Sequence, residues 1–216
     1  MKSMLVIGMG TLGVHLADKL QNLGNQVMII DTREELIESL STRFPDSQIG
    51  DCTNEDVLRS LGINNFDICF VTVGENFQAS LEITTLLKEL GAKYVVSKAK
   101  KDIQVKFLLR NGADEVMYPE RDIAENRAIR YSENNVFDYI KLSDEYAIYE
   151  IPILKEWVGK SIGELNIRNK YEINIIAVKR ENETHPVMGS EYVFKENDHL
   201  VLIGKNSCVA KIKAKK

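Results

Sequence analysis

The first glycines of the chain have the spacing of a phosphate-binding turn. Gly8, Gly10 and Gly13 follow a short apolar run in the order G-x-G-x-x-G, with Thr11 and Leu12 between them. The first glycine of such a motif permits a tight bend, the second lets the backbone approach a pyrophosphate, and the third lets a helix pack on a strand. The free N–H groups at the start of that helix would face the anion.

An acidic residue stands where a ribose would be held. Apolar residues 27–30 predict a second strand, and Asp31, Thr32 and Arg33 follow it. A carboxylate there accepts hydrogen bonds from ribose hydroxyls and disfavours the 2′-phosphate of NADP. Arg33 could tolerate a 2′-phosphate, but we expect it to be solvated. The strand–helix–strand context therefore predicts a nucleotide site, and the alternative is a glycine-rich turn kept only for close packing.

Further candidates follow later strands of the predicted sheet. They are Asp51, Cys52, Thr53, Val73, Gly74, Asn76 and Lys98. Ligands in open α/β sheets bind at the carboxyl ends of strands, so we expect Gly74 and Asn76 near the phosphates. Lys98 could neutralise phosphate charge as a point cation, and its alternative is a solvated loop lysine. Thr53 or Asn54 could cap the helix that follows.

Strands and helices that could position these side chains alternate along the first part of the chain. The expected strands are residues 4–7, 27–30, 48–50, 67–73, 94–97 and 115–117. The expected helices are residues 11–23, 33–44, 54–61, 78–90, 103–110 and 120–132. This alternation predicts a Rossmann-like, doubly wound, mostly parallel sheet of the α/β class with right-handed crossovers.

The pattern changes near residue 143, where short alternating runs begin. Strands are expected at residues 147–153, 173–178 and 199–203, with short helices near 162–166 and after 206. These predict a second, small α+β domain of about 70 residues. We therefore expect a nucleotide-binding domain over residues 1–134, which includes a crossover helix, and a linker with the second domain over residues 135–216.

Composition excludes several classes of protein. The 216 residues carry a net charge of -4 with mixed signs, which argues against a nucleic-acid partner. Three cysteines without a C-x-x-C pair fit reduced thiols in a cytosolic protein. The sequence contains no apolar stretch that approaches the length needed to span a membrane.

The order of these motifs resembles the cytosolic regulatory subunits of Trk/Ktr potassium uptake systems, which are built from RCK (KTN-type) domains. The first half resembles them through GMGTLG at 8–13, IID at 29–31, GDCT at 50–53, GENFQAS at 74–80 and NGADEVMYPERD at 111–122. The second half resembles the RCK C-terminal (TrkA-C) domain through VGKSIGELNIRNKYEINIIAVKR at 158–180 and ENDHLVLIGK at 196–205. The resemblance covers essentially the whole chain.

This resemblance implies a regulatory protein and not an enzyme. Such proteins form homodimers that often assemble into rings beneath a potassium-translocating membrane subunit, and nucleotide exchange reshapes the ring and gates the pore. The expected location is therefore cytoplasmic, at the inner face of the cell membrane through the partner. The alternatives are a small NAD-dependent oxidoreductase and a redox-sensing transcription regulator, although no helix-turn-helix is recognisable.

The resemblance also implies roles for single residues at the nucleotide site. Asp51 and Cys52 would approach the adenine edge. Thr11 stands where some members that bind ATP and ADP carry an arginine, so NAD or NADH gains weight over ATP or ADP. Glu120 matches a carboxylate that some relatives use to hold a divalent cation near the phosphates. The alternative for Glu120 is a favourable acid in the first turn of a helix.

A second ligand is implied for the C-terminal domain, where relatives can bind cyclic di-AMP at a two-fold interface. Arg168 would pair with phosphate and Asn174 would hydrogen-bond it. Ile162, Ile173 and Ile175 would flank the bases. The alternative is an amphipathic strand that dimerises through its apolar face.

Overall fold

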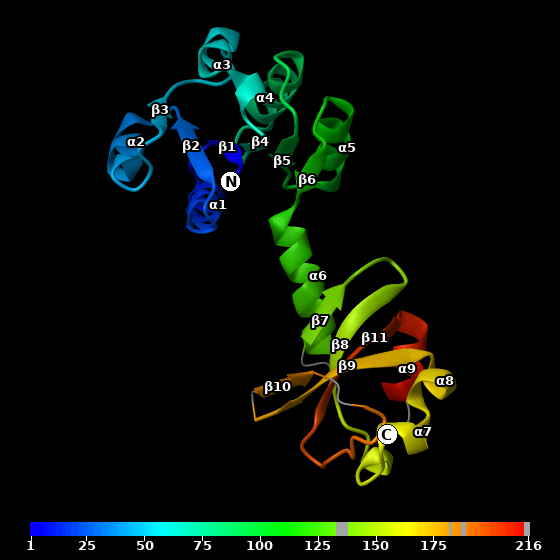
Figure 1. Cartoon of the computed structure of the whole chain (residues 1–216). Helices are drawn as coiled ribbons and strands as arrows, with labels where there is room; N and C mark the ends of the chain where they lie inside the picture. The colour runs from blue at the N-terminus through cyan, green and yellow to red at the C-terminus, as the bar shows by residue number, and fades with distance from the viewer. Residues whose placement is uncertain (133–137, 182, 187–188, 214–216) are drawn as a thin grey trace. The chain divides into compact units, whose positions relative to one another are not determined.

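The protein is described here from a computed structural model, which covers residues 1–132, 138–181, 183–186 and 189–213. The chain divides into two compact units, Met1–Arg121 and Asp122–Lys216, and each is described by itself. Figure 1 colours the first unit from blue to green and the second from green to red. The division falls earlier than the boundary expected after residue 134, which lies outside the described residues, as does the expected break at residues 134–135.

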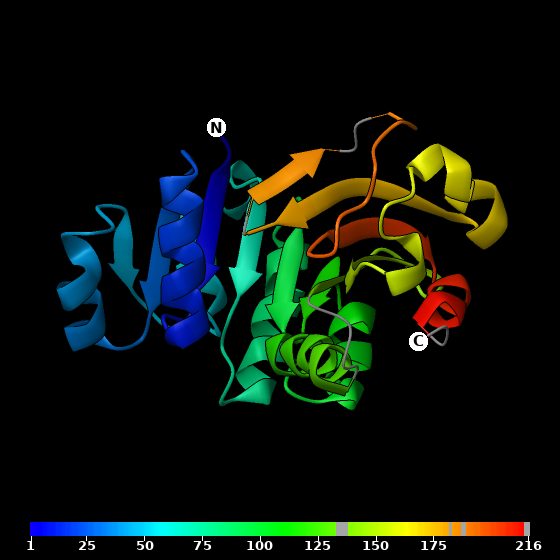
Figure 2. The ribbon, with the colours of Figure 1, turned by 90° about the horizontal axis from the view of Figure 1, so that it is seen from below.

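The first unit contains a six-stranded parallel sheet with the strand order β3-β2-β1-β4-β5-β6. Its strands are β1 (Ser3–Ile7), β2 (Gln26–Asp31), β3 (Ser47–Ile49), β4 (Ile68–Val71), β5 (Val95–Lys98) and β6 (Glu115–Met117). Its helices are α1 (Thr11–Asn22), α2 (Glu34–Ser41), α3 (Glu55–Leu61), α4 (Phe77–Glu89) and α5 (Asp102–Arg110), with a 3₁₀ turn at Ile63–Asn65. Figure 2 shows these parallel strands side by side, from the blue β1 to the green β6. The predicted doubly wound α/β fold is confirmed.

Helices cover both faces of this sheet. Successive strand residues point to opposite faces, and the residues on both faces are buried. Met4 and Val6 of β1 pack in one apolar cluster with residues of α1 and α2. Leu5 and Ile7 pack in another cluster with residues of α3 and α4. The strand order reverses between β1 and β4, so that the loops after these two strands diverge at the carboxyl edge of the sheet.

Some expected boundaries of the first unit differ from the structure. The strand expected to reach residue 73 ends at Val71, which leaves Thr72 and Val73 in the loop. Asn54, not Thr53, caps α3, because its side-chain oxygen accepts the N–H of Asp56. A longer loop after β4 gives the carboxyl edge more backbone that can contact a ligand.

The second unit is built on a five-stranded antiparallel sheet with the order β10-β9-β11-β8-β7. The strands are β7 (Asp138–Lys141), β8 (Tyr146–Pro152), β9 (Ile173–Arg180), β10 (Glu183–Pro186) and β11 (His199–Lys205). The helical segments are a 3₁₀ turn at Lys155–Trp157, α7 (Ile162–Leu165), α8 (Ile167–Tyr171) and α9 (Asn206–Lys213). The connecting helix α6 (Pro119–Ser132) spans the division between the units. This unit confirms the expected small α+β domain.

Two strands of this sheet were not expected from the sequence. They are β7 and β10, which lie at the two edges and each pair with a single neighbour. All four residues of β10 are exposed, so the segment carries no apolar alternation that would indicate a strand. Pairing with β9 therefore forms this strand in spite of its polar sequence.

A buried carboxylate joins two segments of the second unit. Asp198 is fully buried, and its oxygens accept bonds from Arg180, from the Tyr192 hydroxyl and from the Lys195 N–H. Burial by itself would raise the pKa of Asp198, but these donors outweigh it and lower the pKa. Every lone pair that the burial removes from water thus has a protein partner.

Replacement of Asp198 by alanine is expected to destabilise the protein by about 3–5 kcal/mol, because it leaves Arg180 and Tyr192 without their acceptor. Urea unfolding followed by circular dichroism measures this change. Glu196→Ala, a nearby exposed acid, serves as the control and is expected to change stability by less than about 0.5 kcal/mol. Equal effects of the two substitutions would contradict the assignment.

No helix in the described part of the chain is both long enough and apolar enough to cross a membrane.

Candidate functional site

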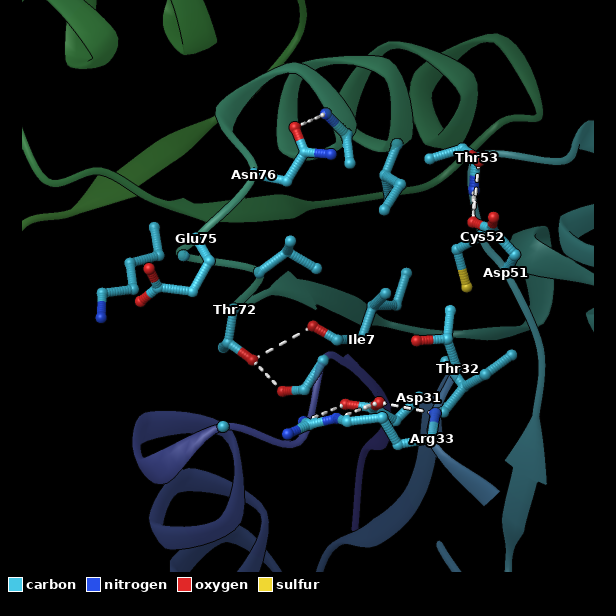
Figure 3. Close-up of a pocket in the computed structure, with 18 of the residues that line it drawn as sticks. Ile7, Asp31, Thr32, Arg33, Asp51, Cys52, Thr53, Thr72, Glu75 and Asn76 are labelled. Atoms are coloured by element: carbon cyan, nitrogen blue, oxygen red, sulfur yellow. Dashed lines mark hydrogen bonds and ion pairs between the residues drawn. The ribbon is translucent and has the colours of Figure 1, made fainter. Parts of the chain in front are cut away.

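A cavity of about 730 Å³ opens at the carboxyl edge of the parallel sheet (Figure 3). Its walls come from the loops after β1, β2, β3 and β4, from the start of α4, and from the end of β5. The expected site residues that line it are Gly8, Gly10, Thr11, Leu12, Asp31, Thr32, Arg33, Asp51, Cys52, Thr53, Val73, Gly74, Asn76 and Lys98. Residues that line the cavity but were not named as site candidates from the sequence are Ile7, Ile30, Gly50, Thr72, Glu75, Gln78, Ala79, Glu82 and Ile83.

The glycines of the turn between β1 and α1 serve different purposes. Gly8 has φ +92, which L side chains rarely adopt. A Cβ on Gly13 would lie 2.1 Å from the Gly8 carbonyl oxygen, so this residue permits the helix to approach the strand. Gly13 does not appear in the cavity wall. A Cβ on Gly10 would meet no atom within 4 Å, so its lack of a side chain leaves room above the backbone.

Thr72 holds this turn from the loop that follows the neighbouring strand β4. Its hydroxyl donates to the carbonyl oxygens of Ile7 and Gly8, and its backbone N–H donates to Ile7 at 2.9 Å. These bonds from the start of the loop after β4 thus hold the turn after β1, which would contact the ligand. Sequence reasoning missed Thr72, because the contact joins residues more than sixty positions apart.

Asp31 is held in place at the end of β2. Its side chain is 6% exposed, and it accepts the Met9 N–H at 2.6 Å and the Arg33 N–H at 3.0 Å. The guanidinium of Arg33 donates to both carboxylate oxygens at 2.8 Å, as the dashed lines in Figure 3 show. Burial would raise the pKa of Asp31, but these bonds lower it to about 2. Arg33 lines the cavity and pairs with Asp31, and its side chain remains 60% exposed, in agreement with the expected solvent exposure.

Cys52 and Asp51 form the part of the wall after β3. The Cys52 side chain is buried, and burial together with the charges of Asp51 and Asp31 raises its pKa to about 12. The neutral thiol therefore adds apolar surface to the wall. Asp51 is exposed and accepts both the N–H and the hydroxyl of Thr53. Its bonds form a turn that is separate from the Asn54 cap of α3.

Two lysines lie beside the loop after β4. The Nζ atoms of Lys98 and Lys100 are 3.6 and 3.7 Å from the position that a Cβ on Gly74 would take. Lys98 is 13% exposed and pairs with Glu120 at 3.2 Å, and Lys100 pairs with Glu75 at 2.6 Å. Lys98 is thus not a freely solvated loop lysine. Both cations are placed where they could attract phosphate.

The helices that begin at the cavity lack acids in their first turns. This holds for α1 and for α4, whereas α2, α3 and α5 each have an acid there. Asn76 caps α4 by accepting the Ala79 N–H at 3.1 Å. The cavity therefore faces two helix N-termini whose partial positive charge is not compensated within the helix.

Glu120 is the expected cation ligand, and it lies beside the cavity without lining it. Its side chain is 56% exposed and pairs with Lys98. Among the described residues no group of three His, Cys, Asp or Glu side chains is arranged to hold a metal ion. A cation at Glu120 would therefore need oxygens from a ligand or from another chain.

The residues expected to hold a second ligand are distributed unevenly in the second unit. Arg168 and Asn174 are exposed, while Ile162 and Ile175 pack partly against the core. Ile173 is 1% exposed and belongs to the core itself. The side chain of Ile173 therefore packs inside this unit and is not open to a base, in contrast to its expected place beside the ligand.

Comparison with known proteins assigns the family. The TrkA-N domain model matches residues 4–119, and the TrkA-C domain model matches residues 146–216. The chain therefore belongs to the family of TrkA proteins that combine these two domains, and the resemblance inferred from the sequence is confirmed.

Curated relatives in Bacillus subtilis (strain 168) match along nearly their whole lengths. Ktr system potassium uptake protein C is 39% identical over 203 residues, which cover 94% of this chain and 92% of that protein. Ktr system potassium uptake protein A is 36% identical over 203 residues, which cover 94% of this chain and 91% of that protein.

A solved structure shares the fold at lower identity. The GsuK channel bound to NAD superposes with a TM-score of 0.71 over 98% of this chain and 39% of that chain, at 20% identity.

The glycine contacts predict that two substitutions change the stability of the protein by different amounts. Gly13→Ala is expected to cost about 2–3 kcal/mol of stability, since its Cβ would overlap the Gly8 carbonyl oxygen. Gly10→Ala meets open space and is expected to stay within about 1 kcal/mol of wild type. Urea unfolding measures both, and a stable Gly13→Ala protein would contradict the account of the turn.

Proposed function

We propose that the chain is a regulatory subunit of a potassium uptake system that binds an adenine nucleotide in the cavity of its first unit. The observation that carries this proposal is the cavity itself, which combines an open glycine turn, two helix N-termini and the carboxylate of Asp31. The two Bacillus relatives are both named as potassium uptake proteins.

The expected ligand is NAD, NADH, ATP or ADP. Asp31 would hold the ribose, the turn at Gly8 and Gly10 would hold the phosphates, and the wall at Cys52 would meet the adenine. Thr11 carries no positive charge, which supports NAD or NADH over ATP. Structures of the GsuK channel, whose fold is similar, are described as bound to NAD and to ADP.

Regulation would follow if the nucleotide binds two shapes of the assembly with different affinities, because only a differential affinity shifts an equilibrium. The assembly would be a homodimer or a larger ring of this chain at the inner, cytoplasmic face of the membrane. A separate membrane subunit would conduct potassium. Nucleotide exchange would then gate that subunit without any catalytic step in this chain.

Two further ligands belong to the same proposal. A divalent cation would bridge Glu120 and the nucleotide phosphates, after Lys98 has moved from Glu120 to a phosphate. Cyclic di-AMP would bind at a two-fold interface of the second unit, with Arg168 and Asn174 toward its phosphates and Ile162 and Ile175 beside its bases. The exposed positions of Arg168 and Asn174 support this arrangement.

The proposal predicts thermal stabilisation by adenine nucleotides. NAD, NADH, ATP, ADP and AMP are added separately to the full chain, with and without Mg²⁺, and melting is followed. A ligand at a hundred times its dissociation constant adds about 2.7 kcal/mol, which corresponds to about 5–10 °C for a chain of this size. The Asp31→Asn variant is expected to lose most of this shift.

Asp67→Asn is the matched control. Asp67 is also ion-paired and also accepts a backbone N–H, from Ser3, but it lies just before β4 at the opposite edge of the sheet. This variant is expected to keep the full nucleotide shift. The proposal fails if no nucleotide raises the melting temperature, or if Asp31→Asn responds as wild type does.

A further inference from the structure

The carboxylate of Asp31 has no acceptor position left for a ligand. A carboxylate has about four lone-pair sites on its two oxygens. Four donors occupy them: the N–H of Met9, the N–H of Arg33, and the Nε and Nη2 groups of the Arg33 side chain, at 2.6–3.0 Å. A ribose hydroxyl can therefore bind Asp31 only where one of these donors leaves.

The four donors differ in their freedom to leave. The two N–H groups belong to the backbone that follows β1 and β2, so they stay with the fold. The guanidinium is on a flexible side chain that is 60% exposed, while Asp31 is 6% exposed. Rotation of the Arg33 side chain into solvent frees two acceptor positions, one on each oxygen.

Two acceptor positions are what a ribose requires. The 2′- and 3′-hydroxyls of a nucleotide are neighbouring donors, and the Nε and Nη2 groups of a guanidinium are neighbouring donors in a rigid fork. Both groups can present two parallel donors to one carboxylate. The side chain of Arg33 thus occupies the place at Asp31 that a ribose would take (Figure 3).

We propose that Arg33 is a built-in competitor for the ribose end of the cavity, which every ribonucleotide must displace from Asp31 in order to bind. The inference rests on the proposed nucleotide function and adds a residue that sets the affinity. Arg33 weakens binding of ligands that carry both hydroxyls. A ligand without these hydroxyls leaves the ion pair intact and is unaffected by Arg33.

Calorimetric titration of the full chain tests this inference with two ligands, ADP and 2′,3′-dideoxy-ADP. Arg33→Ala is expected to bind ADP about three to ten times more tightly than wild type, which corresponds to the strength of a partly exposed ion pair. The same variant is expected to bind the dideoxy ligand as wild type does. Arg33→Lys, which cannot form the fork, should lie between wild type and Arg33→Ala for ADP.

Arg59→Ala is the matched control. Arg59 is 61% exposed and pairs with Glu55 on the surface of α3, outside the cavity wall. This variant is expected to leave both affinities unchanged, and melting curves establish that all variants are folded.

The possible outcomes separate this inference from the proposed function. Weaker or unchanged ADP binding by Arg33→Ala overturns the inference and leaves the nucleotide function standing. An equal gain for both ligands also overturns it, since the effect would then not depend on the hydroxyls. Failure of both proteins to bind either ligand overturns the inference, and it overturns the proposed function as well only if NAD, NADH and ATP also fail to raise the melting temperature of the chain. Binding of ADP by Arg33→Ala alone supports both.

Discussion

The contact between the Gly13 position and the Gly8 carbonyl oxygen is the constraint on which the site depends. The α1 helix can begin so close to β1 only because Gly13 carries no Cβ, and Gly8 makes the bend before it with a φ of +92. Thr72 then fastens the same turn through the Ile7 and Gly8 carbonyl oxygens. The open backbone at Gly10 and the Met9 N–H that binds Asp31 both follow from this turn. The cavity thus depends on the conformation of the loop after β1, at the point where the loops after β1 and β4 diverge.

The ion pairs around the cavity suggest how a ligand would enter it. Asp31 pairs with Arg33, Lys98 with Glu120, and Lys100 with Glu75. Binding of a nucleotide would therefore replace ion pairs within the protein by contacts between the protein and the nucleotide. The free energy of binding would be the difference between these two sets of interactions. The same exchange would let a ligand change the conformation of the segments that carry these acids. Glu120 lies in the first turn of α6, and Glu75 belongs to the loop after β4.

The sequence predicted those parts of the structure that local patterns determine. The spacing of Gly8, Gly10 and Gly13, and an acid after the second strand, predicted the place of the cavity, and the alternation of strands and helices indicated the fold. The sequence did not reveal the bond from Thr72, because that bond depends on which strands are neighbours. It indicated the solvent exposure of Arg33 but not the pairing of Arg33 with Asp31, which depends on the conformation of the loop after β2. The edge strand β10 was missed because its polar residues carry no strand pattern.

A crystal structure of the full chain grown with ADP tests the central claim most directly. The account predicts that the diphosphate lies against the turn at Gly8 and Gly10. The two ribose hydroxyls should lie within hydrogen-bond distance of Asp31, with the Arg33 side chain turned away from it. A nucleotide bound elsewhere, or a ribose that does not contact Asp31, would contradict the account.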